Sequence, residues 1–384
     1  MQFEFSIATR IIFGPGTLDS IGNLAYEIGP KAFIISGCPR KITDRLVHLL
    51  EVCGISCVTA DNIHEPTISS ILLLVEIGHQ FSPDLVIGIG GGSALDSAKA
   101  TSVFLTNPGN ITDYLEVVGL NKPLISESIP LIAIPTTSGT GAEITKNAVI
   151  GSTENHVKVS LRSPLLFPKI ALIDPELTLL LPQDITAFTG IDALTQLIEP
   201  FTCKAPNPLV DALCKDGIQR IGHSLNTAFD VGSEYNARED MSFASLLSGL
   251  ALSNAKLGAV HGLAGPLGGE IQAPHGAICA CLLANVIEQN LSAINHRNPN
   301  HLVLERFDMI GKILCDDPAA KASDAVNWIR EFVNHAEIPT LSFYGLTEQK
   351  FNNIIENSMR ASSMKGNPIS LSKDELRCVL QRSL

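Results

Sequence analysis

A short apolar run that ends in glycines and then turns helical constrains the fold most strongly. Leu85 to Ile89 is rich in β-branched residues, as expected for a strand buried in a parallel sheet. Gly90, Gly91, Gly92 and Ser93 follow at once, and a helical pattern continues from there. Such a turn lets backbone N–H groups approach a pyrophosphate at the positive end of a helix. The spacing is not the G-x-G-x-x-G fingerprint, so a simple tight strand-to-helix turn remains the alternative.

A second loop of the same character follows. Leu131 to Ile134 is again a short buried strand, and residues 135–141 are dense in hydroxyl side chains and glycines. These groups can donate hydrogen bonds to a phosphate or a ribose. Two such loops, each after a predicted strand, indicate ligand binding at the carboxyl ends of the strands in an open α/β sheet.

The patterns divide the chain into two predicted domains. In residues 1–182, strand-like runs such as 32–36 and 56–60 alternate with helical stretches, which is typical of βαβ units. Beyond Asp184 the strand signals fade. Phe243, Leu246, Leu247 and Leu250 then have the spacing of a core-facing helical stripe. We therefore expect an α/β dinucleotide-binding domain over 1–182 and an all-helical domain over 183–384, and the length agrees with two domains.

Four side chains in the second half form a candidate metal site. Asp192 and Gln196 are four residues apart, so they project from one face of a helix. His261 and His275 each lie in apolar, glycine-rich surroundings. A carboxylate with two imidazoles suits a catalytic divalent transition metal that keeps an open position. The plainer interpretation is that these are surface or satisfied core residues, because no local signature such as H-E-x-x-H is present.

Composition disfavours several other classes. The net charge of −12, without a basic run, disfavours nucleic-acid binding. Nine dispersed cysteines and an N-terminus without a signal-peptide layout indicate the reducing cytoplasm. Residues 271–287 lack charges, but polar residues interrupt them, so we expect a buried helix rather than a membrane span. Only 17% of the residues are charged, which indicates extensive burial and a homodimer or larger homo-oligomer.

Taken in order, these motifs resemble the iron-containing (group III) alcohol dehydrogenase family, which is related to glycerol dehydrogenase and, more distantly, to dehydroquinate synthase. The match runs from FGPG at residues 13–16 through GGGSALDSAKA, PTTSGTGAEIT, ALIDPELT and GIDAL to the two histidine segments, and it covers nearly the whole chain. The resemblance implies an α/β N-terminal domain, an all-helical C-terminal domain and bound Fe²⁺ or Zn²⁺. It also implies hydride transfer between a nicotinamide cofactor and a small alcohol, aldehyde or ketone.

The same resemblance implies roles for individual residues. Asp192, His261 and His275 would bind the metal and be catalytic, with Gln196 at the position of the fourth ligand. The cofactor would be held by the first loop and by polar residues close to it, namely Gly90, Gly91, Gly92, Ser93, Asp96, Thr136, Thr137, Ser138 and, with a weaker match, Lys158.

The cofactor preference rests on the end of one strand. In the family that this chain resembles, this strand usually ends near a residue that discriminates the two nicotinamide cofactors, and an aspartate there would bind the adenosine ribose and repel a 2′-phosphate. Gly37 occupies that position here, with Arg40 and Lys41 close by. Loss of the anion next to two cations favours NADP(H) over NAD(H). Alternatively, the two cations simply begin a solvated helix.

Two departures from the family pattern leave other functions open. Gln196 replaces a histidine ligand, and a neutral amide oxygen binds iron or zinc more weakly than imidazole does. Gly265 stands where many members have a second histidine facing the nicotinamide, so a proton relay through that side chain is absent. The alternatives are therefore a metal-independent reductase of the maleylacetate reductase type, a dehydroquinate synthase-like lyase and a non-catalytic binding protein.

Overall fold

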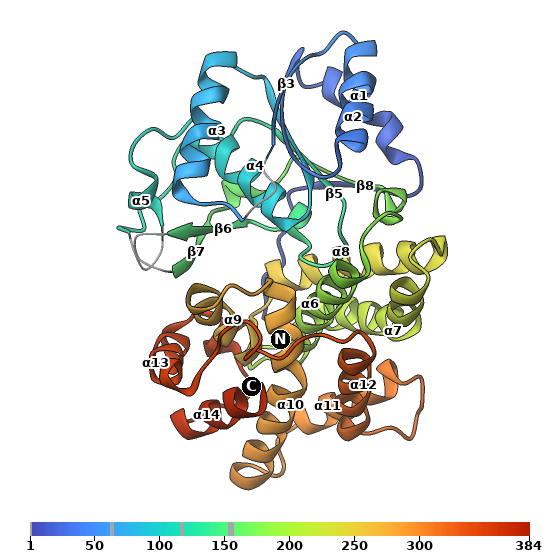
Figure 1. Ribbon diagram of the computed structural model, residues 1–384, viewed down its shortest axis with the longest axis vertical. Coiled ribbons are helices and arrows are strands. Elements are labelled where there is room, and N and C mark those ends of the chain that lie inside the picture. Colours follow the sequence, from blue (N-terminus) through green and yellow to red (C-terminus); the bar gives the residue numbers. More distant parts are fainter. Residues whose placement is uncertain (1, 62–64, 116–118, 153–156) are drawn as a thin grey trace. The chain divides into compact units, whose positions relative to one another are not determined.

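The computed structural model describes residues 2–61, 65–115, 119–152 and 157–384 (Figure 1). The chain forms two compact units, Ile7–Leu180 and Leu181–Leu384, and the first six residues group with the second unit. The sequence predicted a division between residues 182 and 183, and the structural division falls just before that point.

The first unit is built on a six-stranded parallel sheet with the strand order β1-β8-β5-β4-β2-β3. The strands are β1 (Arg10–Phe13), β8 (Ile170–Ile173), β5 (Leu131–Pro135), β4 (Leu85–Gly90), β2 (Lys31–Gly37) and β3 (Ser56–Asp61). Every residue of β4 and β5 is buried, because helices cover both faces of a parallel sheet and no face is left for polar side chains.

Alternate side chains of β2 show how the two faces are covered. Ala32 and Ile34 pack with residues of α1 (Ile21–Tyr26) and α2 (Arg40–Val52). Phe33 and Ile35 pack on the other face with residues of α3 (Ile68–Phe81) and α4 (Gly92–Phe104). This alternation is the period of two expected of a strand buried on both sides.

Smaller elements complete the unit. They are a short helix and an antiparallel pair of strands, namely α5 (Ile111–Tyr114), β6 (Asn147–Ser152) and β7 (Val157–Arg162). Loops and short 3₁₀ helices connect these elements. One of them, Pro175–Thr178, is capped by Asp174, whose side chain accepts a hydrogen bond from the Glu176 N–H.

The second unit contains helices and, within the described residues, no strand. The helices are α6 (Gln183–Thr202), α7 (Pro208–Asp230), α8 (Tyr235–Asn254), α9 (Ala259–Glu270), α10 (His275–Arg297), α11 (Val303–Leu314), α12 (Ala322–His335), α13 (Phe351–Arg360) and α14 (Lys373–Arg382). Leu246, Leu247 and Leu250 of α8 are buried, and Phe243 is half-buried beneath the Arg220 guanidinium. The predicted fold class, an α/β domain followed by an all-helical domain, is confirmed.

Helix α10 contains most of the charge-free segment. By length and composition it could cross a bilayer, as could α8 and α9 if that bent pair were one span. However, 78% of the apolar window in α10 is buried inside the fold. Burial by protein accounts for the apolar character of α10, in line with the buried helix expected from the sequence.

Candidate active site

One face of α6 supplies three polar side chains that are buried in the helical unit. Asp192, Gln196 and Glu199 follow one another at intervals of four and three residues, so they lie along one side of the helix. Buried carboxylates are costly unless charged or donor groups compensate them. The partners of these three side chains therefore define the site.

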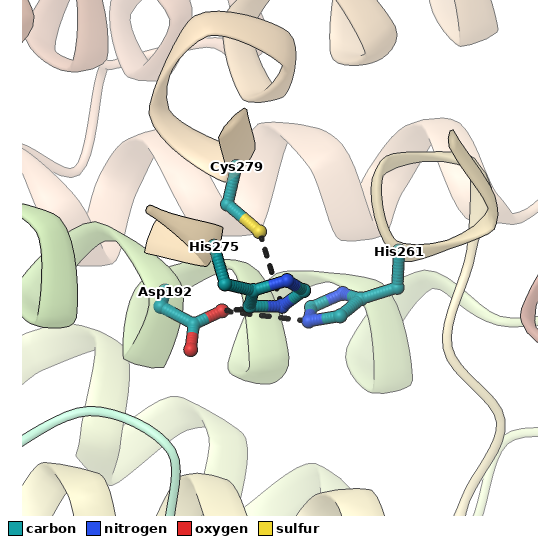
Figure 2. Close-up of side chains that lie close together, drawn as sticks. All are labelled: Asp192, His261, His275 and Cys279. Atoms are coloured by element: carbon teal, nitrogen blue, oxygen red, sulfur yellow. Dashed lines mark hydrogen bonds and ion pairs between the residues drawn. The ribbon is translucent and has the colours of Figure 1, made fainter. Parts of the chain in front are cut away.

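Two histidines from different helices meet Asp192 (Figure 2). The Nε2 atom of His261, on α9, lies 3.5 Å from Asp192 Oδ1, and the Nε2 atom of His275, at the start of α10, lies 3.7 Å from the same oxygen. Asp192 is 2% exposed, and its Oδ1 has no hydrogen-bond partner among the described residues. A buried carboxylate oxygen that accepts no hydrogen bond and faces two imidazole nitrogens fits a bound divalent cation, so the predicted residues suit the metal that the family implies.

Glu199 fixes the orientation of His261. Its Oε2 atom lies 2.7 Å from His261 Nδ1, and its Oε1 atom accepts a hydrogen bond of 2.7 Å from the Val260 N–H. A carboxylate on one imidazole nitrogen turns the other toward a metal, and such partners are common around metal sites. Sequence reasoning missed Glu199, although its position seven residues after Asp192 places it on the same helix face.

The charges in the cluster shift the pKa values of His261 and Asp192. Burial alone would lower the pKa of His261, but the Glu199 and Asp192 carboxylates outweigh burial and raise it to about 10. Burial alone would raise the pKa of Asp192, but His275 and His261 hold it below its ordinary value. Asp192 is thus an anion that attracts positive charge to this point.

Gln196 contacts Asp192 through its amide nitrogen. Its Nε2 donates a 3.1 Å hydrogen bond to Asp192 Oδ2, and its Oε1 accepts a long hydrogen bond of 3.5 Å from Ser248 Oγ. The first bond holds the Asp192 carboxylate so that the other oxygen, Oδ1, faces the histidines. The metal-ligand role predicted for Gln196 remains a prediction.

A cysteine that sequence reasoning did not consider joins the cluster. Cys279 Sγ lies 3.7 Å from His275 Nε2, one helical turn further along α10 (Figure 2). Ligand atoms of Asp192, His261, His275 and Cys279 all lie within 4.8 Å of one another. Burial first, then the Asp192 and Glu199 carboxylates, raise the pKa of the Cys279 thiol well above its usual value. The sequence did contain a signal for Cys279, because a residue four positions after His275 lies on the same face of a helix.

Gly276 allows α10 to begin against α6. A Cβ atom at this position would lie 2.2 Å from the backbone oxygen of Phe188, so any side chain would push the helices apart. The glycine directly after His275 therefore permits the close approach that brings His275 to Asp192.

Gly276→Ala is expected to destabilise the protein by about 1–3 kcal/mol and to weaken metal binding, because the clash with α6 displaces His275. Gly265→Ala in α9 is the matched control, since no described atom lies within 4 Å of its added Cβ. That control should change the free energy of unfolding by less than about 1 kcal/mol, because the helix propensity that alanine adds is opposed by crowding against Pro266, the next residue. Thermal unfolding and metal titration measure both effects, and equal behaviour of the two variants would contradict this account of Gly276.

The two loops predicted to bind a cofactor lie side by side in the α/β unit. In the sheet, Gly90 pairs with Gly37 on one side and with Pro135 on the other. Gly90 has a φ of +146°, a conformation that other residues rarely adopt. A Cβ atom on Gly91 would touch Thr137 at 3.3 Å. The first turn of α4 and the residues after β5 thus share one end of the sheet, where ligands bind in open α/β folds.

Asp96 points from α4 to partners inside the unit. Its Oδ1 lies 3.3 Å from Lys99 Nζ, and its Oδ2 accepts a 3.0 Å hydrogen bond from the Val149 N–H. Lys99 is completely buried and also donates to Thr145 Oγ1 and to the Asn147 carbonyl. Burial raises the pKa of Asp96 and lowers that of Lys99, and their mutual attraction opposes both shifts. In this structure, Asp96 and Lys99 are an internal ion pair that supports the loop.

The remaining predicted cofactor residues have varied surroundings. Thr136 and Ser138 are buried, and Thr137 is half-buried. Lys158 lies on β7, where its ammonium is 2.5 Å from Glu65 Oε2. The ion pair uses one of the three N–H donors of the Lys158 ammonium, and the cofactor-binding role of Lys158 remains a prediction.

The structure also shows the surroundings of Gly37. Arg40 and Lys41 begin α2 and are exposed, and Arg40 makes only a loose, exposed ion pair with Asp44 at 3.7 Å. The arrangement agrees both with a solvated helix start and with cations available to a phosphate.

Comparison with known proteins assigns the family. Residues 8–175 match the description "Iron-containing alcohol dehydrogenase", and residues 186–384 match "Fe-containing alcohol dehydrogenase family, C-terminal". A choline dehydrogenase of Bacillus subtilis is 31% identical, with 98% of this chain and 94% of the relative covered. An NADPH-dependent butanol dehydrogenase of Clostridium saccharobutylicum is 31% identical, with 99% and 97% covered.

Solved structures agree. An alcohol dehydrogenase from Oenococcus oeni is 30% identical, covers 100% of both chains and has a TM-score of 0.90. The chain belongs to the iron-containing alcohol dehydrogenase family. This family resemblance was predicted from the motifs and is confirmed, and it places the protein among the oxidoreductases that act on CH–OH groups of small molecules.

Proposed function

We propose that the protein is a metal-dependent, NAD(P)-linked alcohol dehydrogenase that also works in reverse as an aldehyde reductase. One observation carries the metal dependence, namely the buried Asp192 Oδ1, which lacks a hydrogen-bond partner among the described residues and faces the Nε2 atoms of His261 and His275. A Fe²⁺ or Zn²⁺ ion held by these side chains would be a Lewis acid that lowers the pKa of an alcohol or polarises a carbonyl group.

The residues of the site divide the work. Asp192 contributes the negative charge, and Glu199 keeps the ring of His261 in place through Nδ1. The side chain of His275 is 40% exposed, so it is the member of the cluster nearest to solvent and to an arriving substrate. The glycine and hydroxyl loops after β4 and β5 would bind the cofactor pyrophosphate and ribose. The cofactor itself supplies hydride chemistry, and the protein provides orientation and exclusion of water.

The test of metal dependence begins with elemental analysis of protein purified without a chelator. Reduction of a panel of aldehydes is then measured before and after chelation, and again after the metal is restored. We expect one transition-metal ion per chain and activity that follows its removal and return. Undiminished activity without metal would instead identify a metal-independent reductase of the maleylacetate reductase type. Cofactor binding without turnover on any carbonyl would indicate a binding protein.

We further propose that NADP(H) is preferred over NAD(H). The support is Gly37 at the end of β2, where an acidic side chain would repel a 2′-phosphate, together with the exposed Arg40 and Lys41. The relative from Clostridium saccharobutylicum is named as NADPH-dependent, which points the same way.

The preference is measured as the ratio of kcat/KM for NADPH to kcat/KM for NADH. Gly37→Asp should reduce the efficiency with NADPH by about tenfold or more, because it puts an anion beside the 2′-phosphate. Its efficiency with NADH should be kept, which also shows that the variant is folded. A wild-type protein that uses NADH equally well or better would refute the preference.

The remaining proposals concern setting and substrate. The nine cysteines are all free in the structure, which agrees with a reducing cytoplasm. We also propose a homodimer or larger homo-oligomer, which sedimentation analysis tests directly. The named substrates of the relatives differ, from choline to butanol, so the proposal extends to a small alcohol or aldehyde as a class.

A further inference from the structure

We propose that Cys279, and not Gln196, is the fourth protein ligand of the metal and that the site is therefore suited to Zn²⁺. This inference rests on the proposed metal dependence and names the ion and the ligand that distinguish this chain. It concerns a side chain to which the family pattern assigns no role.

The distances within the cluster agree with tetrahedral zinc. Bond lengths of about 2.0–2.3 Å place neighbouring ligand atoms of a tetrahedral site about 3.3–3.6 Å apart. The measured separations are 3.5 Å from Asp192 Oδ1 to His261 Nε2, 3.7 Å from Asp192 Oδ1 to His275 Nε2 and 3.7 Å from His275 Nε2 to Cys279 Sγ. These three separations lie close to the tetrahedral values, and all four donor atoms lie within 4.8 Å of one another, so the side chains must draw together to surround one ion.

Gln196 presents the wrong atom for ligation. Its Nε2 faces Asp192 Oδ2, and an amide nitrogen is a donor of hydrogen bonds without a lone pair for a metal. Turning the amide over would bring its oxygen against the carboxylate oxygen Oδ2 and would lose the hydrogen bond to Asp192. Gln196 is thus a positioning residue that holds the carboxylate.

The chemistry of the donors favours zinc over iron. A thiolate is a soft ligand that selects Zn²⁺, whereas a set of carboxylate and imidazoles alone has no such preference. As the sulfur–metal bond forms, the Cys279 thiol releases its proton to solvent, so the thiolate and Asp192 together balance the two positive charges of the ion. Zinc can accept a fifth ligand, so four protein ligands still leave room for a substrate.

The absorption spectrum of bound Co²⁺ shows whether a cysteine sulfur is a ligand, and it requires no assay of activity. Co²⁺ is added to metal-free wild-type protein and to the variants Cys279→Ser and Cys281→Ser. Cys281 is the matched control because it lies on the same helix and its Sγ donates to the Pro339 carbonyl outside the cluster. We expect a sulfur-to-cobalt charge-transfer absorption in the wild type and in Cys281→Ser and its loss in Cys279→Ser. Zinc affinity should fall in Cys279→Ser alone, by about a hundredfold or more.

A second substitution separates the two candidate ligands. In the Cys279→Ser background, Gln196→His should restore much of the zinc affinity, because it supplies the imidazole that the family pattern has at that position. Stoichiometric cobalt binding without charge-transfer absorption, and equal affinity of Cys279→Ser and the wild type, would overturn the role of Cys279 while leaving the metal-dependent function intact. Failure of the wild type to bind either metal would overturn both.

Discussion

Replacement of Asp192 by asparagine is expected to lower kcat/KM for aldehyde reduction by about a thousandfold or more, which corresponds to about 4 kcal/mol of lost transition-state stabilisation. The substitution keeps the shape of the side chain and removes its charge. The amide oxygen can still accept the hydrogen bond from Gln196 Nε2, so the fold should survive. What disappears is the anionic oxygen that faces His261 and His275.

Steady-state kinetics and metal content per chain measure this effect together. Asp184→Asn is the matched control, because Asp184 lies in the first turn of the same helix and is exposed. It should retain its metal and its activity. An Asp192→Asn protein with a full complement of metal and near-normal turnover would show that the cluster is not the catalytic centre.

The second large effect is on stability. Lys99→Met is expected to destabilise the α/β unit by about 3–5 kcal/mol, because it removes the cation from a buried ion pair and leaves the anion behind. The ammonium of Lys99 is wholly buried and contacts Asp96, Thr145 and the Asn147 carbonyl. Burial raises the pKa of Glu143 to about 7 even though the Lys99 ammonium opposes that rise.

Calorimetric unfolding of the wild type and the variant measures the loss. Lys169→Met is the control, since Lys169 belongs to the same unit and is exposed, and a change there should stay within about 0.5 kcal/mol. A Lys99→Met variant as stable as the wild type would mean that the methionine packs well enough to replace the ionic network.

The sequence predicted the parts of the site that depend on local pattern. The strands before Gly90 and Pro135 could be recognised from short β-branched runs, and adjacent parallel strands bring their carboxyl ends together. The pairing of Asp192 with Gln196 followed from helical spacing. Bringing His261 and His275 to Asp192 depended on the family resemblance, because their separation along the chain carries no local signal.

Other residues of the site could be recognised only from the three-dimensional structure. Glu199 and Cys279 each lie one or two helical turns from a predicted ligand, but such intervals are frequent in any helix, and only the approach of α9 and α10 to α6 makes these two significant. Lys99 belongs to a helix that is buried on nearly every side, and its partners Thr145 and Asn147 come from a later loop and strand. Local pattern cannot report which distant groups will compensate a buried charge.

The cluster joins side chains from α6, α9 and α10, so a metal ion bound there would cross-link segments that are far apart in the chain. An ion that binds only the folded protein adds about 2.7 kcal/mol of stability at a free concentration one hundred times its dissociation constant. The same ion would therefore govern both turnover and lifetime. In a cell short of that metal, we expect the helical unit to open more often and the protein to be degraded faster, so that its abundance follows the metal supply.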